Sequence, residues 1–296
     1  MHQASLYHRA NNAQRHDAKQ ILEEYANIIQ WRPEGRDTLI DIGCGSGDVL
    51  IDFVYPLMPV NFEQLLGTDI SAKMIAYARK CYADFERTKF KILDIGCEKI
   101  PSELNGCFDH VTSFYCLHWV QNQKQALQNI FKLLRPQSGD CLLVFLATNR
   151  VYDAYRRLST LNKWSSYMQD VEQFISPLHN SKDPSSDFSK LLQDAGFADY
   201  TVEIRNEVYV YEGVKNVKDN VKAICPFFER IPEQQHEDFL DDFVSTVVSM
   251  KLYESNGQGT DYKFISPYKL VVAYARKCSD FVSNVIGGKH VIKGLN

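Results

Sequence analysis

Long hydrophobic stretches and targeting features are missing from this 296-residue chain. No apolar run approaches the roughly 20 residues that a membrane-spanning helix requires. Residues 1–20 are polar and lack the apolar segment of a secretory signal, and the acidic Asp17 with the absence of serine enrichment argues against a transit peptide. We therefore expect no membrane span and a cytoplasmic protein.

Paired cysteines and an excess of positive charge are missing too. The eight cysteines form no C-x-x-C pair, and several lie in apolar stretches such as "CLLVFL". We interpret them as reduced, mostly buried thiols, and we expect neither a disulfide framework nor a metal site. The formal net charge is −4, so there is no basic excess to neutralise phosphates, and a nucleic-acid partner is disfavoured.

Apolar runs and helical periodicities alternate through the first half of the chain. Strands are predicted at residues 38–43, 64–71, 89–95, within 108–120 and at 140–148, and helices at 13–29, 49–58, 72–82 and 122–136. Such alternation is typical of an α/β fold. We predict a doubly wound, mostly parallel, seven-stranded sheet with helical lid insertions.

The second half has a different pattern. A helix at 188–197, strands at 200–212 and 267–277, and a largely helical stretch at 217–255 are predicted. We expect one folded unit with four segments: an N-terminal helical cap (1–36), a cofactor-binding core (37–148), lid helices with returning strands (149–277) and a tail (278–296).

A glycine-rich turn follows the first predicted strand, in "TLIDIGCGSGDVL" at residues 38–50. Gly43, Gly45 and Gly47 let the backbone approach a ligand closely and lead into a helix N-terminus. Dinucleotide folds use G-x-G-x-x-G, whereas the order here is G-x-G-x-G behind Asp41. An acidic neighbour disfavours a phosphate and favours a cationic sulfonium cofactor with its amino-acid group.

Acidic residues stand at or near the ends of three successive strands. Asp41 is expected to orient the ammonium of the cofactor, Asp69 its ribose and Asp94 its adenine amino group, because α/β sheets bind ligands at the carboxyl ends of their strands. We predict a nucleoside-sulfonium pocket whose contacts are Asp41, Gly43, Gly45, Gly47, Asp69, Ile70, Asp94, Ile95 and Ser113.

The motifs "LIDIGCGSGDVL", "LLGTDIS", "KFKILDI" and "FDHVTSFYCLHWV" occur in the order found in class I S-adenosylmethionine-dependent methyltransferases, which the chain resembles. "SLYHRANNAQRHDA", "VYDAYRRLSTLNKW", "FISPLHN" and "FLDDFVSTV" extend the resemblance to the insect juvenile hormone acid O-methyltransferases. The resemblance implies methyl transfer from S-adenosyl-L-methionine to juvenile hormone acid or farnesoic acid, with S-adenosyl-L-homocysteine as the second product. It also implies that Gln14 and Trp119 hold the substrate carboxylate.

Methylation of a carboxylate requires no general base, because an acid with a pKa of about 4 to 5 is ionised at neutral pH. The enzyme must position the oxygen in a dry site. Neutral donors suit this task better than arginine, whose attraction is largely lost as the ester forms. Gln14 and Trp119 are of that type, and His118 is expected to pack without acting as a base, so no essential base should titrate near pH 6.5.

A sesquiterpenoid acid, the expected small-molecule partner, requires an apolar tunnel. The residues predicted to contact it, besides Gln14 and Trp119, are aromatic or apolar: Tyr115, His118, Tyr152, Tyr155, Trp164, Phe174, Ile175, Pro226, Phe227 and Phe228. We also expect residues 5–19 to order when ligands bind. The sequence indicates no oligomeric state.

Four other functions are compatible with parts of the sequence. A methyltransferase for a fatty acid or a small polyacid shares the core motifs, although a polyacid site would require cationic residues. A methyltransferase for an amine, a ring carbon or RNA is a second alternative, although the negative net charge disfavours RNA and an amine usually requires a carboxylate or base facing the methyl group, for which the sequence has no clear candidate. A non-catalytic S-adenosylmethionine-binding domain and a nicotinamide-dependent dehydrogenase remain as two further classes.

Overall fold

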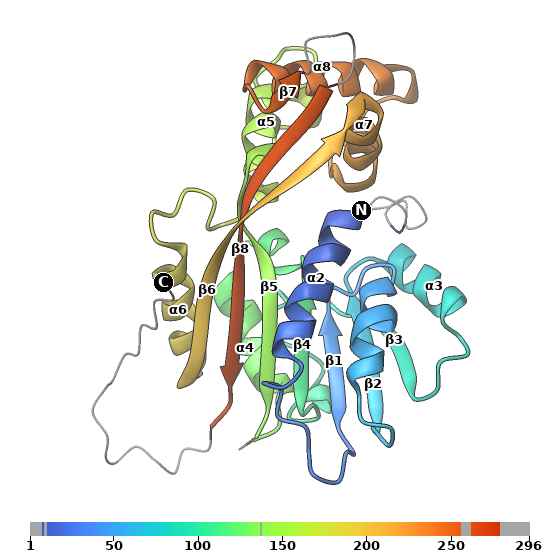
Figure 1. Ribbon diagram of the computed structural model, residues 1–296, viewed down its shortest axis with the longest axis vertical. Coiled ribbons are helices and arrows are strands. Elements are labelled where there is room, and N and C mark those ends of the chain that lie inside the picture. The colour runs from blue at the N-terminus through green and yellow to red at the C-terminus, as the bar shows by residue number, and fades with distance from the viewer. Residues whose placement is uncertain (1–7, 9–10, 137, 256–261, 279–296) are drawn as a thin grey trace.

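A single twisted sheet organises the computed structural model, which describes residue 8 and residues 11–136, 138–255 and 262–278. The strand order is β3-β2-β1-β4-β5-β8-β6, and β7 pairs with β8 as an additional strand beyond the seven predicted (Figure 1). The first five strands in this order are parallel, β8 runs antiparallel to β5, and β6 and β7 each pair antiparallel to β8. The strands are β1 Thr38–Ile42, β2 Gln64–Asp69, β3 Thr88–Ile92, β4 His110–Phe114, β5 Asp140–Asn149, β6 Asp199–Glu212, β7 Tyr253–Ser255 and β8 Tyr262–Arg276.

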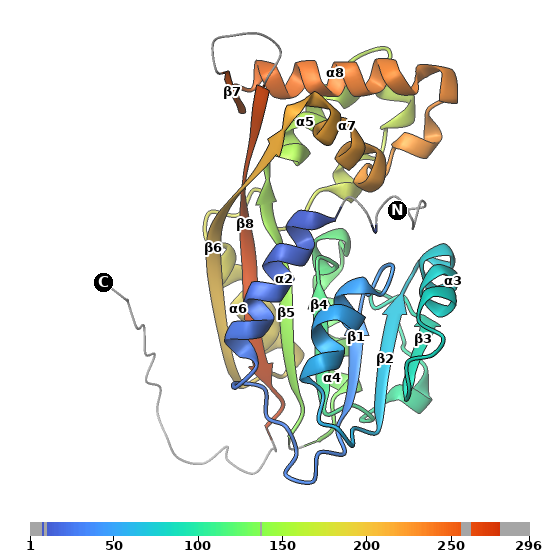
Figure 2. The same ribbon diagram turned by 45° about the vertical axis from the view of Figure 1, so that its right-hand side comes forward.

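Helices cover both faces of the sheet, as a doubly wound fold requires. The α-helices are α2 Asn12–Tyr25, α3 Ala72–Cys81, α4 Gln123–Leu133, α5 Arg150–Ser159, α6 Pro184–Ala195, α7 Gly213–Ile224 and α8 His236–Ser249. In Figure 2, α2 lies across one face of the sheet, while α4 and α6 lie behind it. The predicted fold class is therefore confirmed.

The two faces have separate hydrophobic cores. Along β1, Leu39 belongs to the core beneath α2, whereas Ile40 and Ile42 belong to the core beneath α4 and α6. Leu65 and Leu66 of β2 divide in the same way. This alternation follows from the two-residue period of a strand, which sends successive side chains to opposite faces.

Local sequence features set several element boundaries. Ser71 accepts a hydrogen bond from the Met74 amide at the start of α3, and Gly196 closes α6 with φ of +108°, as predicted. The helix expected at 13–29 ends earlier, at Tyr25. The helix expected at 49–58 forms as a π-helix, Leu50–Val54, followed by a 3₁₀ turn that contains Pro56.

A lid stands above the carboxyl edge of the sheet, formed by α5, α7, α8, β7 and the outer ends of β6 and β8 (Figure 1). Helix α8 packs against both α5 and α7. The β6–β8 pairing is continuous from Asp199↔Arg276 in the sheet to Glu212↔Lys263 in the lid, whereas β5 pairs with β8 only as far as Tyr268. The largely helical lid is confirmed except for β7.

Some expectations concern the cysteines and the chain ends. All eight cysteines are free, but only Cys44, Cys141 and Cys225 are buried, so the expectation that most are buried was wrong.

None of the helices in the described ranges has the length and apolar character to span a bilayer. The predicted tail lies outside the described residues beyond Cys278, and so do residues 5–7, 9 and 10 of the segment expected to order on binding. The four segment boundaries stay predictions.

Candidate active site

The glycine turn connects β1 to the π-helix. Gly43, Gly45 and Gly47 all have positive φ, at +74°, +54° and +87°. A Cβ on Gly43 would lie 2.3 Å from Cβ of Cys116, so the turn can approach the segment after β4 only without a side chain there. A Cβ on Gly47 would instead meet Phe90, so this glycine serves packing inside the core.

A cavity of about 470 Å³ opens at the carboxyl edge of the sheet, and we call it the cofactor cavity. Its walls include five residues of the predicted set: Gly43, Asp69, Ile70, Asp94 and Ile95. Of the remaining four, Gly45 contributes through its backbone and Asp41 lines a small adjoining cavity. Gly47 and Ser113 are not in the wall, and Ser113 is fully buried with its hydroxyl donating to the Ile42 carbonyl.

Asp69 ends β2, as predicted, and is held at the rim of the cofactor cavity. The Gly45 amide donates to one carboxylate oxygen at 3.0 Å, and the Ser71 amide donates to the other at 2.7 Å. Burial raises its pKa. Asp94, two residues beyond the end of β3, is exposed at the same rim and accepts from the Gly96 amide. Both carboxylates retain lone pairs for a ligand.

Asp41 lies within β1, not at its end, and is only 2% exposed. Burial, together with the charges of Asp69 and Asp48, raises its pKa to about 7, although the Thr112 hydroxyl donates to it at 2.7 Å. Asp48 is paired with Arg15 at 2.7 Å, whereas Asp41 and Asp69 lie beside the glycine turn and their charges repel each other. A cation bound nearby would relieve their repulsion, so these residues fit a sulfonium cofactor and do not fit a pyrophosphate.

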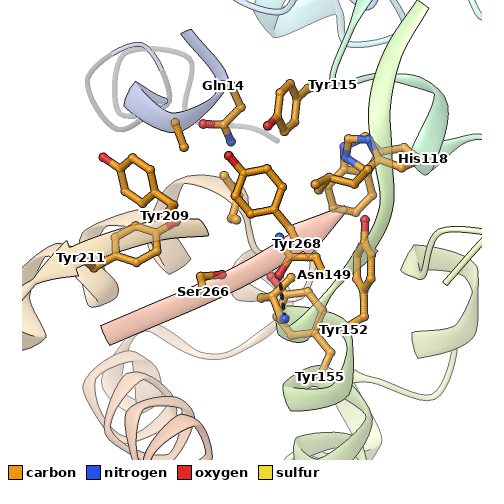
Figure 3. Close-up of a pocket in the computed structure, with 15 residues that line it drawn as sticks. Gln14, Tyr115, His118, Asn149, Tyr152, Tyr155, Tyr209, Tyr211, Ser266 and Tyr268 are labelled. Atoms are coloured by element: carbon orange, nitrogen blue, oxygen red, sulfur yellow. Dashed lines mark hydrogen bonds between the residues drawn. The ribbon is translucent and has the colours of Figure 1, made fainter. Parts of the chain in front are cut away.

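A second, smaller cavity of about 60 Å³ adjoins the first, and we call it the acceptor cavity (Figure 3). Its walls come from the start of α2, the segment after β4, the end of β5, α5 and the outer parts of β6 and β8. Gln14 and Trp119, the two residues expected at the substrate carboxylate, both lie in this wall, and so does His118. Tyr115 and Trp119 line both cavities.

A third cavity, of about 70 Å³, extends from the acceptor cavity into the lid, and we call it the lid cavity. It shares Asn149, Val151, Tyr211, Ile224 and Ser266 with the acceptor cavity. Its other walls are mostly apolar side chains of α7, α8 and β8: Val217, Val221, Phe243, Val247 and Phe264. The three cavities are therefore neighbours, in sequence from the cofactor edge to the lid interior.

The acceptor cavity contains buried polar atoms that have no hydrogen-bond partner among the described residues. They are Gln14 Oε1, His118 Nδ1, Tyr152 Oη and Tyr155 Oη. Burial lowers the pKa of His118 to about 3, so its ring is neutral. Because buried polar groups in native proteins are generally paired, their concentration in one cavity indicates a site for a polar ligand group.

Helix α2 is held over this site by contacts that sequence reasoning missed. The hydroxyls of Tyr115 and Tyr268 both donate to Asp17, the latter at 2.8 Å. At the start of the helix, Asn11 and Arg15 donate to Asp48, at 2.8 and 2.7 Å. Gln14 lies one turn before Asp17, so the same contacts set its position. The spacing of Gln14 and Asp17 on one helix face was the only available sequence signal.

The lid residues predicted to contact the substrate lie in three different environments: the acceptor cavity, the cofactor cavity and buried positions outside the cavity walls. Tyr152 and Tyr155 line the acceptor cavity, whereas Phe174 and Pro226 line the cofactor cavity. Four others are buried and are not in the wall of any of the three cavities: Trp164, Ile175, Phe227 and Phe228. Trp164 packs edge-on against Phe239, and its indole N–H donates to Asp242 at 2.9 Å, so its place is in the lid core.

Comparison with known proteins agrees with this geometry. A family model described as "Methyltransferase domain" matches residues 40–139. Two solved structures share the fold: BH2331 of Bacillus halodurans (TM-score 0.56, 17% identity, 87% of this chain and 99% of that chain) and YcgJ of Bacillus subtilis (TM-score 0.55, 16% identity, 88% and 98%). Fold and site define a class I S-adenosylmethionine-dependent methyltransferase.

Two curated relatives narrow the assignment. The chain is 60% identical to juvenile hormone acid O-methyltransferase of Drosophila melanogaster over the full length of both proteins. It is 41% identical to juvenile hormone acid O-methyltransferase of Bombyx mori, over 94% of this chain and 98% of the relative. The chain belongs to the juvenile hormone acid O-methyltransferase family.

Proposed function

We propose that the protein transfers a methyl group from S-adenosylmethionine to the carboxylate of juvenile hormone acid or farnesoic acid, which yields the methyl ester. One observation carries this proposal: the cofactor cavity, with Asp69 and Asp94 in its wall, adjoins the acceptor cavity, which is followed by a lid cavity among apolar side chains, and Tyr115 and Trp119 line both the cofactor and the acceptor cavities. The full-length similarity to the two insect enzymes supports the same substrate class.

The residues of the cofactor cavity would hold S-adenosylmethionine, which supplies an electrophilic methyl group on a cationic sulfur. Asp69 is fixed by two backbone amides and remains available to ribose hydroxyls. Asp94 lies at the rim of the same cavity, where we place the adenine. The carboxyl group of Asp41, below the glycine turn, favours the positive charge of the ligand.

Gln14 and Trp119 would hold the acceptor carboxylate with neutral N–H donors. Such donors orient the oxygens without adding a formal charge that would hold the ionised acid more strongly than the ester. His118 is a poor base because burial lowers its pKa to about 3. The substrate is already ionised, so alignment of its oxygen with the sulfur–methyl bond is the main task of these residues.

The lid would receive the hydrocarbon chain. The acceptor and lid cavities measure about 60 and 70 Å³, and a cavity needs about 10–15 Å³ on this measure to hold one water, so each has room for only a few waters. A fifteen-carbon acid therefore displaces lid side chains when it binds. We also propose that the enzyme acts in the cytoplasm, where its eight free cysteines would stay reduced.

A radiolabelled methyl-transfer assay tests the proposal. The panel contains juvenile hormone acid, farnesoic acid, a saturated sixteen-carbon fatty acid and a tricarboxylic acid. The terpenoid acids should have a kcat/KM at least about tenfold above that of the tricarboxylic acid, because its additional carboxylates would have to lose their hydration in the apolar cavity. Equal turnover of the tricarboxylic acid, or transfer to none of the four, would overturn the proposal.

A further inference from the structure

Tyr152 is a buried hydroxyl group without a function in the scheme above. It lies in the first turn of α5, is 1% exposed and packs edge-on against the ring of His179, with centroids 5.1 Å apart. The side chain lines the acceptor cavity, and its buried hydroxyl has no hydrogen-bond partner among the described residues. Burying a hydroxyl without a partner is unfavourable, and a phenylalanine would fill the same volume without that cost.

A second unpaired polar atom borders the same space. Figure 3 shows the Tyr152 hydroxyl pointing toward the ring of His118, whose Nδ1 is also buried and unpaired. The two groups come from different elements, α5 and the segment after β4, and both line the acceptor cavity. His118 packs against Trp119, with ring centroids 4.9 Å apart, so this polar spot lies next to the indole expected at the carboxylate.

We propose that the Tyr152 hydroxyl donates a hydrogen bond to the substrate carboxylate, as a third donor beside Gln14 and Trp119. The inference rests on the proposed function, since it concerns the same acid. A carboxylate offers about four lone-pair positions. The attacking oxygen directs one of them at the methyl group, which leaves three for the protein, and three neutral donors fill them.

Tyr155 is the neighbouring alternative and is less suitable. Its hydroxyl has no hydrogen-bond partner among the described residues, but the Cys225 thiol lies beside it and each group affects the pKa of the other. A thiol is a weak hydrogen-bonding group, yet it provides a partial alternative that the Tyr152 hydroxyl does not have. Tyr152 is therefore the residue that requires a ligand atom most.

The variant Tyr152→Phe tests the proposal in the full-length enzyme. We expect kcat/KM to fall about 10- to 100-fold, the loss typical of a hydrogen bond to a charged group. The factor should be the same for fifteen-carbon farnesoic acid and for ten-carbon geranic acid, because the contact is made to the carboxylate that both share. A loss below about twofold, or one that grows with chain length as for a tunnel wall, would overturn the inference.

Two controls separate this role from a structural one. Tyr253→Phe changes a lid tyrosine that packs edge-on against Tyr262 and is not in the wall of any of the three cavities, and it should leave kcat/KM within twofold. Calorimetric binding of S-adenosylhomocysteine should be unchanged in both variants, which reports an intact fold and cofactor cavity.

Binding to the complex with S-adenosylhomocysteine gives a second readout. Tyr152→Phe should weaken binding of farnesoic acid about tenfold or more, and binding of its neutral methyl ester less than twofold. Equal weakening of acid and ester would overturn the inference. If the unaltered enzyme methylates no terpenoid acid, the proposed function has failed; if it does and Tyr152→Phe is equally active, only the role of Tyr152 has failed.

Discussion

Two buried histidines stand at opposite ends of β4 and differ in almost every physical respect. His110 begins the strand at the amino edge of the sheet, and His118 lies in the turn beyond its carboxyl end. Both are 2% exposed. Burial alone lowers the pKa of either ring, yet hydrogen bonds to Asp140 and Asp37 raise that of His110 to about 9, whereas the pKa of His118 falls to about 3.

The partners explain the difference. His110 donates to Asp140 at 2.6 Å and to Asp37 at 2.8 Å, and the Tyr274 hydroxyl donates to Asp140 at 2.7 Å. Only one atom of this network, Asp37 Oδ2, has no partner among the described residues. His118 faces a cavity with three other unpaired polar atoms. The ion-paired His110 at the amino edge of the sheet therefore contributes to folding stability. The unpaired polar atoms around His118 at the carboxyl edge are instead available to bind a ligand.

Removing His110 is the strongest test of this contrast. His110→Ala leaves two carboxylates buried without their cation, and the loss of one member of a buried ion pair typically costs about 3–5 kcal/mol. We expect urea unfolding to show that loss, while kcat per folded molecule stays within twofold. His16→Ala, at an exposed position of α2, should change the free energy of unfolding by less than about 0.5 kcal/mol. If kcat per folded molecule fell by more than twofold while the free energy of unfolding stayed the same, His110 would act in catalysis and not in stability, and the contrast would be wrong.

The pH dependence of stability should show the same network. The pKa of His110 is about 9 in the folded protein and about 6.5 in an unfolded chain. Its contribution is therefore complete below pH 6.5 and is lost as the pH rises through 9, a decline of about 3 kcal/mol if the full shift is realised. Unfolding at pH 6.5, 8 and 9.5 measures it. His110→Gln should remove most of the slope, and an unchanged slope would exclude His110 as its source.

At the carboxyl edge, Asp17 should affect catalysis more than cofactor binding. Asp17→Asn removes the charge that accepts from Tyr115 and Tyr268 and so loosens α2 around Gln14. We expect kcat/KM to fall about tenfold, with S-adenosylhomocysteine affinity within threefold. Glu24→Gln is the matched control, because Glu24 holds Arg205 from an exposed position of the same helix. Parallel losses of cofactor affinity and kcat/KM would refute a positioning role.

The smallest expected effect concerns Asp41, whose pKa is about 7. Its carboxyl group is mostly neutral below that pH and becomes an anion above it, so affinity for the cationic cofactor should rise from pH 6 to 7.5 and then level off. The rise is at most about tenfold per pH unit, since one proton is involved. Calorimetry with S-adenosylmethionine tests this, and Asp41→Asn should flatten the profile. Identical profiles in both proteins would contradict it.

Much of the fold and of the cofactor cavity could be predicted because the signals are local. The apolar strands, the Ser71 cap, the Gly196 stop and the positive φ angles of the glycine turn each depend on local sequence. Local reasoning was weaker for individual contacts, since Ser113 belongs to the right strand but is fully buried and bonded to Ile42.

The acceptor cavity was harder to predict because its walls come from distant parts of the chain. Asp17 and Tyr268 are 251 residues apart in sequence, and neither has a pattern that points to the other. Aromatic composition indicated burial for Trp164 and Tyr152 alike, yet the first lies in the lid core and the second in the cavity wall. Tertiary packing decides whether an aromatic side chain lies in the lid core or in the cavity wall, and the pattern of a single sequence does not predict that packing.

The uninterrupted pairing of β6 with β8 sets the distance between the methyl donor and the far end of the lid. Because side chains alternate along a strand, removing two residues from each strand above Tyr268 would lower the lid by about 7 Å and leave every remaining side chain on its original face. Removing one residue from each strand would instead move every side chain beyond the deletion to the opposite face of the sheet. Relatives that accept shorter or longer acids can therefore differ by even-numbered steps in these two strands, with the cofactor end of the enzyme unaltered.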